Sequence, residues 1–437
     1  MSPDLRDRLF RIRGIRMPGV CRALSGAVLI TVGAAQDNTL HLDEVMRRVM
    51  VNSPELTGLE AYLREQSAVA DQARRWSNPV LTLEKENFAG SRAYRGSALA
   101  EYTATLDQTI EVGGKRGLRV DLARLGQRQA ELKLAVKRTA LAAEVRRRFV
   151  MLQLAQGQWR NATERLETTH AAAEVVSAKR GAGVSGGPEG ARTQVSVSLA
   201  EVELARAASQ LDRAREQLAR LWDGTGTEVA GVVETLLLVA PPPGDEAAWL
   251  RRLQDGPRWQ LTENWRATQG RHVALAGARV WPDLTLKIGR RWFEQGDDHA
   301  WVAGVALPLP VFDRNRASLR VAREGLTRVE AEAAEERRML REHLTVGLAQ
   351  VKAAHAAAER LQRETLPLAR RSYALVEEGY RLGRYELLFL LEAQQTLYAV
   401  EAGVLDALGE LHLALIDLDD VLGVPEPTPP TPHPGLP

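Results

Sequence analysis

The chain has 437 residues, with 58 Lys and Arg against 56 Asp and Glu, so its formal net charge is only +2. This balance argues against a dedicated nucleic-acid-binding protein, which normally carries a strong basic excess. Hydrophobic residues reach 45% but aromatic residues only 5%, a composition more typical of long packed helices than of a compact all-β enzyme. The single cysteine, Cys21, excludes a disulfide framework and a cysteine-rich metal site.

The N-terminus is typical of an export signal. Several arginines precede the small apolar stretch Ala23–Val32, and Gly33–Ala35 suits a cleavage site before Gln36. Met17 is an alternative start that would leave a signal of ordinary length, and a disordered basic arm is the alternative interpretation of the whole segment. We expect residues 1–35 to be a signal peptide and the mature chain to be a weakly acidic exported protein.

The second half of the chain repeats motifs of the first half, which is the signature of a duplicated unit. The paired motifs are Trp76-Ser77-Asn78-Pro79 with Trp281-Pro282-Asp283, Leu81-Thr82-Leu83 with Leu284-Thr285-Leu286, and Leu118-Arg119-Val120 with Leu319-Arg320-Val321. This pattern predicts one repeat over residues 36–239 and a second over 240–424. Residues 425–437 form a Pro-rich tail that is too polar to pack, so we expect it to be disordered.

Each repeat contains two segments in which apolar and polar residues alternate, as they do in strands with two different faces. The expected strands lie at about 79–88 and 100–110 in the first repeat, and at about 284–293 and 300–309 in the second. Their length suits tilted strands that cross a bilayer, and no apolar run reaches the roughly 18 residues of a spanning helix. If the chain crosses a membrane, we expect it to do so with these strands.

Long helices surround the strands in the pattern. Residues 116–179 contain no proline and carry a seam with heptad spacing, formed by Leu134, Leu141, Val145, Leu152, Trp159 and Leu166. At 1.5 Å per residue this helix would be roughly 96 Å long. Its copy over 316–379 has Pro367 as the only expected kink, and return helices are predicted at 191–223 and 387–422.

The four expected strands and the long helices predict that copies of the chain form an oligomer. A four-stranded sheet in a membrane would leave two open edges, and each unsatisfied backbone group in hydrocarbon costs several kcal/mol. Closed barrels need at least about eight strands. We therefore expect a homotrimer that pools about twelve strands in one barrel, with the helices continuing the wall as a ring.

Three segments carry a resemblance to a known family. Gln108–Gly117 reads QTIEVGGKRG and is similar to the QPIELGGKRG segment of the CzcC-like, heavy-metal branch of the TolC-like outer membrane efflux proteins. Val311–Arg316 resembles the second-repeat counterpart of that segment, and Leu391–Tyr398 matches the family's LDAQRTL helix start. The chain resembles this family over roughly residues 41–424.

The resemblance implies a fold that is mainly α with a transmembrane β part, built as a trimeric β-barrel continued by a periplasmic α-barrel. It implies a passive export channel in the outer membrane of a Gram-negative-type bacterium, docked on a periplasmic membrane-fusion adaptor and an inner-membrane RND-type pump and surrounded by outer membrane lipid. Heavy-metal cations are the expected substrate, and drug efflux or type I protein secretion is the alternative. A periplasmic coiled-coil adaptor or scaffold without a channel is a second alternative.

The turns from strand to helix stand out in the sequence. Glycines allow backbone conformations that a sharp turn needs, and charged side chains suit the place where a barrel meets the periplasm. The expected turn residues are Gly113, Gly114, Lys115 and Arg116 in the first repeat and Asp313 and Arg314 in the second.

No motif predicts covalent chemistry. The glycine spacing and the Ser or Thr of a phosphate loop are missing around Gly114-Lys115. Residues 183–187 fit G-x-S-x-G but follow a helix, whereas a nucleophile elbow follows a strand. The histidines form no His-x-x-x-His pair. We expect no enzyme activity, no cofactor and no metal site.

The connections between the long helices are the expected periplasmic tips. The resemblance assigns adaptor contact to Arg180, Gly183, Val184, Arg381, Gly383 and Arg384. It also assigns a gate, in which Tyr380 matches the family's gate tyrosine and Glu392 an acidic position that faces the lumen. Phe389 stands where some members have a carboxylate and Tyr385 where some have an arginine, so the gate is either a polar lock or an apolar constriction. The alternative is that these residues only pack the tips.

Overall fold

The structure of the protein is a computed structural model that describes residues 39–181, 187–233 and 235–424. The expected signal peptide (residues 1–35) and Pro-rich tail (425–437) lie outside the described residues. The described elements of the first repeat are β1 (Thr39–Leu40), α1 (Leu42–Asn52), α2 (Pro54–Ala73), β2 (Val80–Glu86), η1 (Arg92–Tyr94), β3 (Glu101–Ile110), α3 (Lys115–Gly181), α4 (Gly187–Ala219), η2 (Arg220–Trp222), η3 (Gly226–Glu228) and β4 (Gly231–Val232). Those of the second repeat are α5 (Glu246–Asp255), α6 (Pro257–Ala278), β5 (Leu284–Phe293), β6 (Asp298–Ala306), α7 (Arg316–Arg360), η4 (Leu361–Thr365), α8 (Leu366–Arg381) and α9 (Leu387–Leu422).

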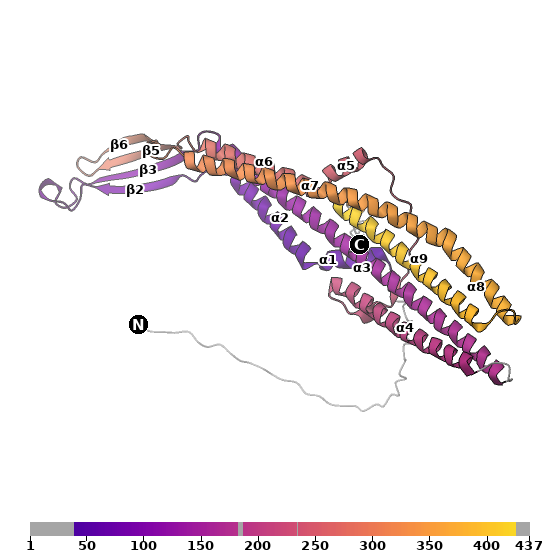
Figure 1. The fold of residues 1–437 in the computed structure, drawn as a ribbon. Coiled ribbons are helices and arrows are strands. Elements are labelled where there is room, and N and C mark those ends of the chain that lie inside the picture. The colour runs from indigo at the N-terminus through magenta and orange to yellow at the C-terminus, as the bar shows by residue number, and fades with distance from the viewer. Residues whose placement is uncertain (1–38, 182–186, 234, 425–437) are drawn as a thin grey trace, which may run out of the picture. The chain divides into compact units, whose positions relative to one another are not determined.

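The two repeats give matching sets of elements, as the paired motifs predict. In each repeat a helix leads into a β-hairpin, and a long helix runs away from the hairpin and returns at a turn. Figure 1 shows the four strands at one end of the helices, with the last residues of α3, the first residues of α4 and the α8–α9 turn at the ends farthest from the strands. The polypeptide therefore places its strand-to-helix turns and its helix-to-helix turns far apart.

The strands form one antiparallel sheet with the order β2-β3-β5-β6. Each hairpin comes from one repeat, and the β3–β5 pairing joins them through ten residue pairs from Glu101↔Phe293 to Ile110↔Leu284. Among the described residues, β2 and β6 each have a neighbour on one side only. The sheet therefore has two open edges, as the sequence predicts.

The first long helix, α3, covers 67 residues without interruption. The predicted seam is buried at Leu134, Val145 and Leu152, but Trp159 is 39% exposed. Steps of seven residues drift by about 20° per heptad round a straight helix, so this stripe leaves the core of the single chain by Trp159.

The corresponding rod of the second repeat is divided into α7 and α8 by one turn of π-helix, η4. Pro367 lies just beyond this turn, at the kink position that the sequence predicts. A proline lacks an N–H group and its ring clashes with the carbonyl four residues earlier. A wider π-turn at that point lets the chain continue as a helix.

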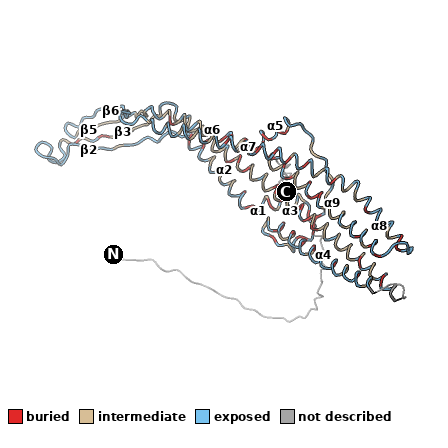
Figure 2. The backbone as a smooth tube through the Cα atoms, in the orientation of Figure 1, coloured by how far each residue is buried: buried red, intermediate tan, exposed pale blue. Residues whose placement is uncertain are grey.

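The buried core lies among the helices, whereas the sheet is mostly exposed or half-buried, as Figure 2 shows. One cluster of buried residues surrounds Leu152 and Leu218 and includes α1, and a second surrounds Leu340 and Leu411. The strands β1 and β4 form a short parallel pair that the sequence did not predict. Leu40 of β1 and Val232 of β4 belong to the first cluster. None of the described helices is both long enough and apolar enough to cross a membrane.

Candidate functional site

The first strand-to-helix turn lies between β3 and α3 and contains Gly113 and Gly114. Both glycines have φ of +74°, a left-handed conformation that L-residues with a side chain adopt at a cost. A Cβ on Gly113 would also lie 3.1 Å from Cβ of Trp281 and 3.2 Å from the carbonyl oxygen of Ala278, whereas a Cβ on Gly114 would meet nothing within 4 Å. The backbone conformation favours glycine at both positions, and close packing against the second repeat requires Gly113 in addition.

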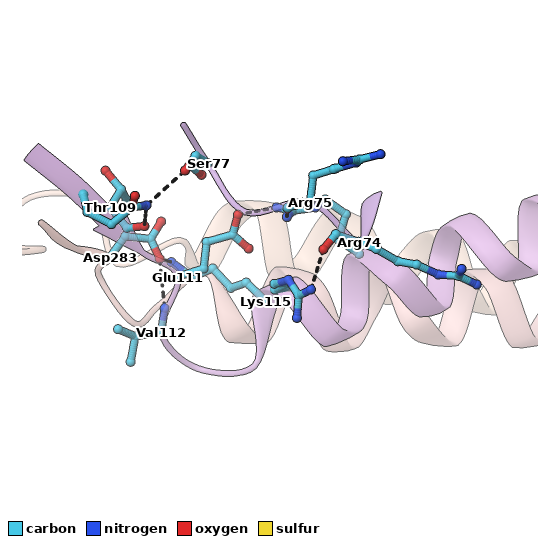
Figure 3. Close-up of polar contacts among 11 residues, drawn as sticks. Arg74, Arg75, Ser77, Thr109, Glu111, Val112, Lys115 and Asp283 are labelled. Carbon is cyan, nitrogen blue, oxygen red and sulfur yellow. Dashed lines mark hydrogen bonds and ion pairs between the residues drawn. The ribbon is translucent and has the colours of Figure 1, made fainter. Parts of the chain in front are cut away.

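Charged contacts tie this turn to the second repeat. The Lys115 Nζ lies 2.7 Å from Oδ1 of Asp283, and the backbone N–H of Val112 donates to the same oxygen at 3.2 Å (Figure 3). Lys115 is largely buried, with 13% of its side chain exposed. Since Asp283 directly precedes β5, this contact holds the ends of β3 and β5 together at the edge of the helices.

Arginines on the first turns of α3 hold the end of α2. Arg116 donates to the backbone carbonyl of Arg74, and its guanidinium lies 4.9 Å from the ring centroid of Trp76. Arg119 pairs with Glu111. The partners in these contacts are side chains and main-chain carbonyls of the chain itself. Lys115 and Arg116 of the GGKRG segment therefore hold the turn in place against its neighbours.

The second turn uses a different residue for the same conformation. Asp313 accepts from the backbone N–H of Asn315 at 2.8 Å, which forms an Asx-turn, and Arg314 is exposed. Asn315 has φ of +57°, and its Nδ2 donates to the carbonyl of Ala276 at 2.6 Å. Asn315 is therefore the counterpart of Gly114, and the sequence reasoning missed it. The signal was available, because asparagine tolerates the left-handed region better than most residues.

The α8–α9 turn is closed by backbone hydrogen bonds. Gly383 has φ of +71°, and the N–H groups of Gly383 and Arg384 donate to the carbonyls of Tyr380 and Gly379 at 3.1 and 2.8 Å. Arg381 is exposed and pairs with Glu377 one helical turn earlier at 2.9 Å. Arg384 is also exposed, so both arginines are accessible on the described chain.

Of the expected tip residues of the first repeat, the structure describes only the position of Arg180. Arg180 lies in the last turn of α3. Gly183 and Val184 lie outside the described residues.

The expected gate residues fall into two groups. Tyr380 is buried at 8% exposure and packs with Val176, Leu387 and Leu390. Tyr385 and Phe389 are about half exposed, at 49% and 52%, with ring centroids 6.0 Å apart and planes inclined by 50°.

The Tyr385 ring lies directly over Gly379, where a Cβ would overlap it. Glu392 is exposed on α9 and lines an open groove of about 630 Å³ with Gln395 and Thr396. The structure thus brings Tyr385 and Phe389 together at the tip and places Tyr380 in the core beside them.

The sheet has one strongly polar face. Alternate residues of the four paired strands place on it Glu84, Glu86, Glu101, Asp107, Asp298, Lys287 and Arg291. Arg291 donates to Glu101 at 2.7 Å, to Glu86 at 3.0 Å and to Thr103 at 2.9 Å, so it ties three strands together. Carboxylates outnumber cations on this face. Among the described residues no three His, Cys, Asp or Glu side chains gather closely enough to hold a metal ion.

These features match a known family along most of the chain. Residues 45–224 and 266–424 match the outer membrane efflux protein family. The chain belongs to this family. Because the match covers both repeats, the alternative of an adaptor or scaffold without a channel is excluded, and the protein is a non-enzymatic efflux channel of the outer membrane that extends into the periplasm.

Relatives and solved structures agree with this assignment. The chain is 30% identical over 356 residues to the cobalt-zinc-cadmium resistance protein CzcC of Cupriavidus metallidurans, which is 80% of this chain and 82% of that protein. It is 26% identical over 280 residues to the nickel-cobalt-cadmium resistance protein NccC of Alcaligenes xylosoxydans xylosoxydans, or 64% of this chain and 62% of that one. The outer-membrane channel OprN has the same fold, with a TM-score of 0.71 at 20% identity over 87% of this chain and 89% of that chain.

The geometry of the first turn predicts unequal effects at its two glycines. A left-handed conformation costs an L-residue roughly 1–2 kcal/mol, and Gly113→Val adds a collision with Trp281. We expect Gly113→Val to lower the amount of assembled protein in the outer membrane more than Gly114→Val. Gly114→Asn should be close to wild type, because Asn315 already adopts this conformation at the equivalent position.

Quantifying assembled protein in outer membrane fractions by gel, together with transport in the same cells, checks this prediction. Normal assembly of Gly113→Val with transport alone lost would contradict it and would assign the glycine pair to ligand binding.

Proposed function

We propose that three copies of this chain form a channel that exports heavy-metal cations, in complex with a periplasmic membrane-fusion adaptor and an inner-membrane RND-type pump. The similarity to CzcC, a cobalt-zinc-cadmium resistance protein, and to NccC, a nickel-cobalt-cadmium resistance protein, supports the metal substrate. Channels of the TolC-like fold form trimers in tripartite efflux systems, which supports the assembly.

The observation that carries the cation substrate is the polar face of the sheet. In a closed trimer this face lines the lumen, because the opposite face is apolar and suits lipid. Five carboxylates face it against two cations in each copy. Arg291 pairs with Glu86 and Glu101, which leaves Glu84, Asp107 and Asp298 against Lys287. An acidic wall raises the local concentration of cations and favours their passage.

The open edges support the trimer. The outer edge of β2 and the outer edge of β6 each present unpaired backbone groups in the single chain. Pairing β6 of one copy with β2 of the next satisfies these groups, and three copies close the ring.

Resistance assays test the substrate. In a strain that lacks the gene for this chain, we expect the wild-type gene to restore growth in cobalt, zinc or cadmium salts and to leave drug sensitivity unchanged. The variant Glu84→Gln/Asp107→Asn should lower the cation preference of the purified channel in planar bilayers, because it removes two of the three carboxylates that Arg291 does not neutralise. Glu246→Gln, an exposed residue on α5, is the matched control. Restored drug resistance without metal resistance would favour drug export, and a protein that migrates as a monomer in detergent would refute the channel assembly.

We also propose that Tyr380, Tyr385, Phe389 and Glu392 hold the tips closed, with the tilted ring pair of Tyr385 and Phe389 as an apolar constriction. An aromatic pair contributes about 0.5–1.5 kcal/mol beyond its buried area, and a trimer contains it three times. Phe389→Ala should therefore shift the closed–open equilibrium toward the open channel by roughly one to three orders of magnitude. If the Tyr380 hydroxyl forms hydrogen bonds in the closed trimer, Tyr380→Phe should act in the same direction.

Single-channel conductance measures this shift. Leu388→Ala, on the neighbouring position of α9, is the control for a change of apolar volume that leaves the ring pair intact, and Glu392→Gln should separately lower cation preference. Wild-type conductance and selectivity in all gate variants would show that these residues only pack the tips.

A further inference from the structure

The outward face of the sheet is mainly apolar, and the strand residues on it include no carboxylate. The register places these alternate residues of the four strands on it: Leu81, Leu83, Lys85, Tyr102, Ala104, Leu106, Gln108, Ile110, Leu284, Leu286, Ile288, Arg290, Trp292, His299, Trp301, Ala303 and Val305. The four strands contain five acidic residues, and all of them lie on the polar face: Glu84, Glu86, Glu101, Asp107 and Asp298. The two faces therefore differ in charge as well as in polarity.

The outward face changes along the strands. Lys85, Tyr102, Trp292 and His299 form the row nearest the hairpin loops. The next row contains Arg290 and Trp301, and the rows nearer the helices are mainly aliphatic, as at Leu106, Ile288 and Ala303. Aromatic residues concentrate where a membrane protein crosses the interface between hydrocarbon and head groups. The loop end of the sheet thus has the composition of an interface and the helix end that of the hydrocarbon region.

Two cations lie within this aromatic zone. The Lys85 Nζ lies 4.9 Å from the ring centroids of both Phe88 and Tyr102. The Arg290 Cζ lies 5.7 Å from the Trp292 centroid, so this side chain leans toward the outermost row. Among the described residues neither cation has a carboxylate partner, and Nε of Arg290 is buried without a hydrogen-bond acceptor. The acidic loop residues at this end of the sheet, Glu294 and Asp297, lie in the turn between β5 and β6.

The adjoining loop continues the positive charge. Residues 87–100 connect β2 to β3, and they contain Arg92 and Arg95 but no Asp or Glu. Figure 1 shows this loop at the end of the sheet farthest from the helices. In the proposed channel this end faces the outside of the cell, so the cations lie at the outer leaflet.

A charged side chain on a lipid-facing surface is costly unless it reaches the interface and meets an anion there. Arginine pairs with phosphate through several parallel donors, and lysine pairs with it as a point charge. We propose that Lys85 and Arg290, with the Arg92 and Arg95 loop, bind the phosphate groups of a phosphorylated glycolipid in the outer leaflet, while the aliphatic rows hold its acyl chains. This inference rests on the outer-membrane trimer proposed above.

Lipid retention by the purified trimer tests the inference. Native mass spectrometry would compare lipid A that carries its phosphates with the same lipid after enzymatic dephosphorylation. Each cation near an anionic lipid surface contributes about a factor of five. The wild-type trimer should therefore retain the phosphorylated lipid about tenfold or more over the dephosphorylated one, and Lys85→Gln/Arg290→Gln should lower this discrimination by about a factor of five for each cation removed.

Lys287→Gln is the matched control, because it removes one positive charge from β5 on the polar face. It should retain the wild-type discrimination. Equal retention of both lipids by the wild-type trimer would overturn the inference. Unchanged discrimination by an assembled Lys85→Gln/Arg290→Gln trimer would also overturn it. Either result would leave the trimeric channel intact, whereas failure of the wild-type chain to form a trimer would refute the proposed function itself.

Discussion

The open edges of the four-stranded sheet are the constraint on which the rest of the structure depends. A membrane offers no water to satisfy the unpaired backbone groups of β2 and β6, so the strands must be completed by other copies of the chain. Closure by threefold symmetry gives each strand two neighbours, directs the apolar face of the sheet toward lipid and encloses the polar face. In the proposed trimer, the excess of carboxylates on that face gives the lumen an acidic wall.

The strand-to-helix turns transmit this geometry to the helical part. Each repeat must turn sharply from a sheet into a rod, and a left-handed residue makes the turn in both, Gly114 in the first and Asn315 in the second. The contact of Lys115 with Asp283 crosses between the repeats at the same level. The local backbone conformation at the sheet therefore sets the directions of α3 and α7. Because these helices are long, their directions also determine where the tips at their opposite ends lie.

Much of this architecture could be predicted from the sequence, because it depends on periodic patterns. Alternation in residues 284–293 and the unbroken run of 116–179 correspond to β5 and α3, and the duplicated motifs predict the symmetry. Features that depend on pairing between distant segments could not be predicted. The alignment of Lys85 with Tyr102 and Trp292, for example, depends on the register of three strands. In the same way, the burial of Tyr380 against Val176 depends on how α3 meets α8 and α9.

Disulfide cross-linking between neighbouring copies tests the closure of the sheet most directly. The only native cysteine, Cys21, precedes the described residues, so engineered pairs are unambiguous. One cysteine would replace Thr82 on β2, and a second would be moved along β6 through Ala300, Val302 and Gly304. These residues face the same side of the sheet as Thr82. Closure predicts covalent dimers and trimers at one β6 position in outer membranes, with weaker bands on either side. Monomers alone at every position would contradict the threefold sheet and with it the account of the lumen.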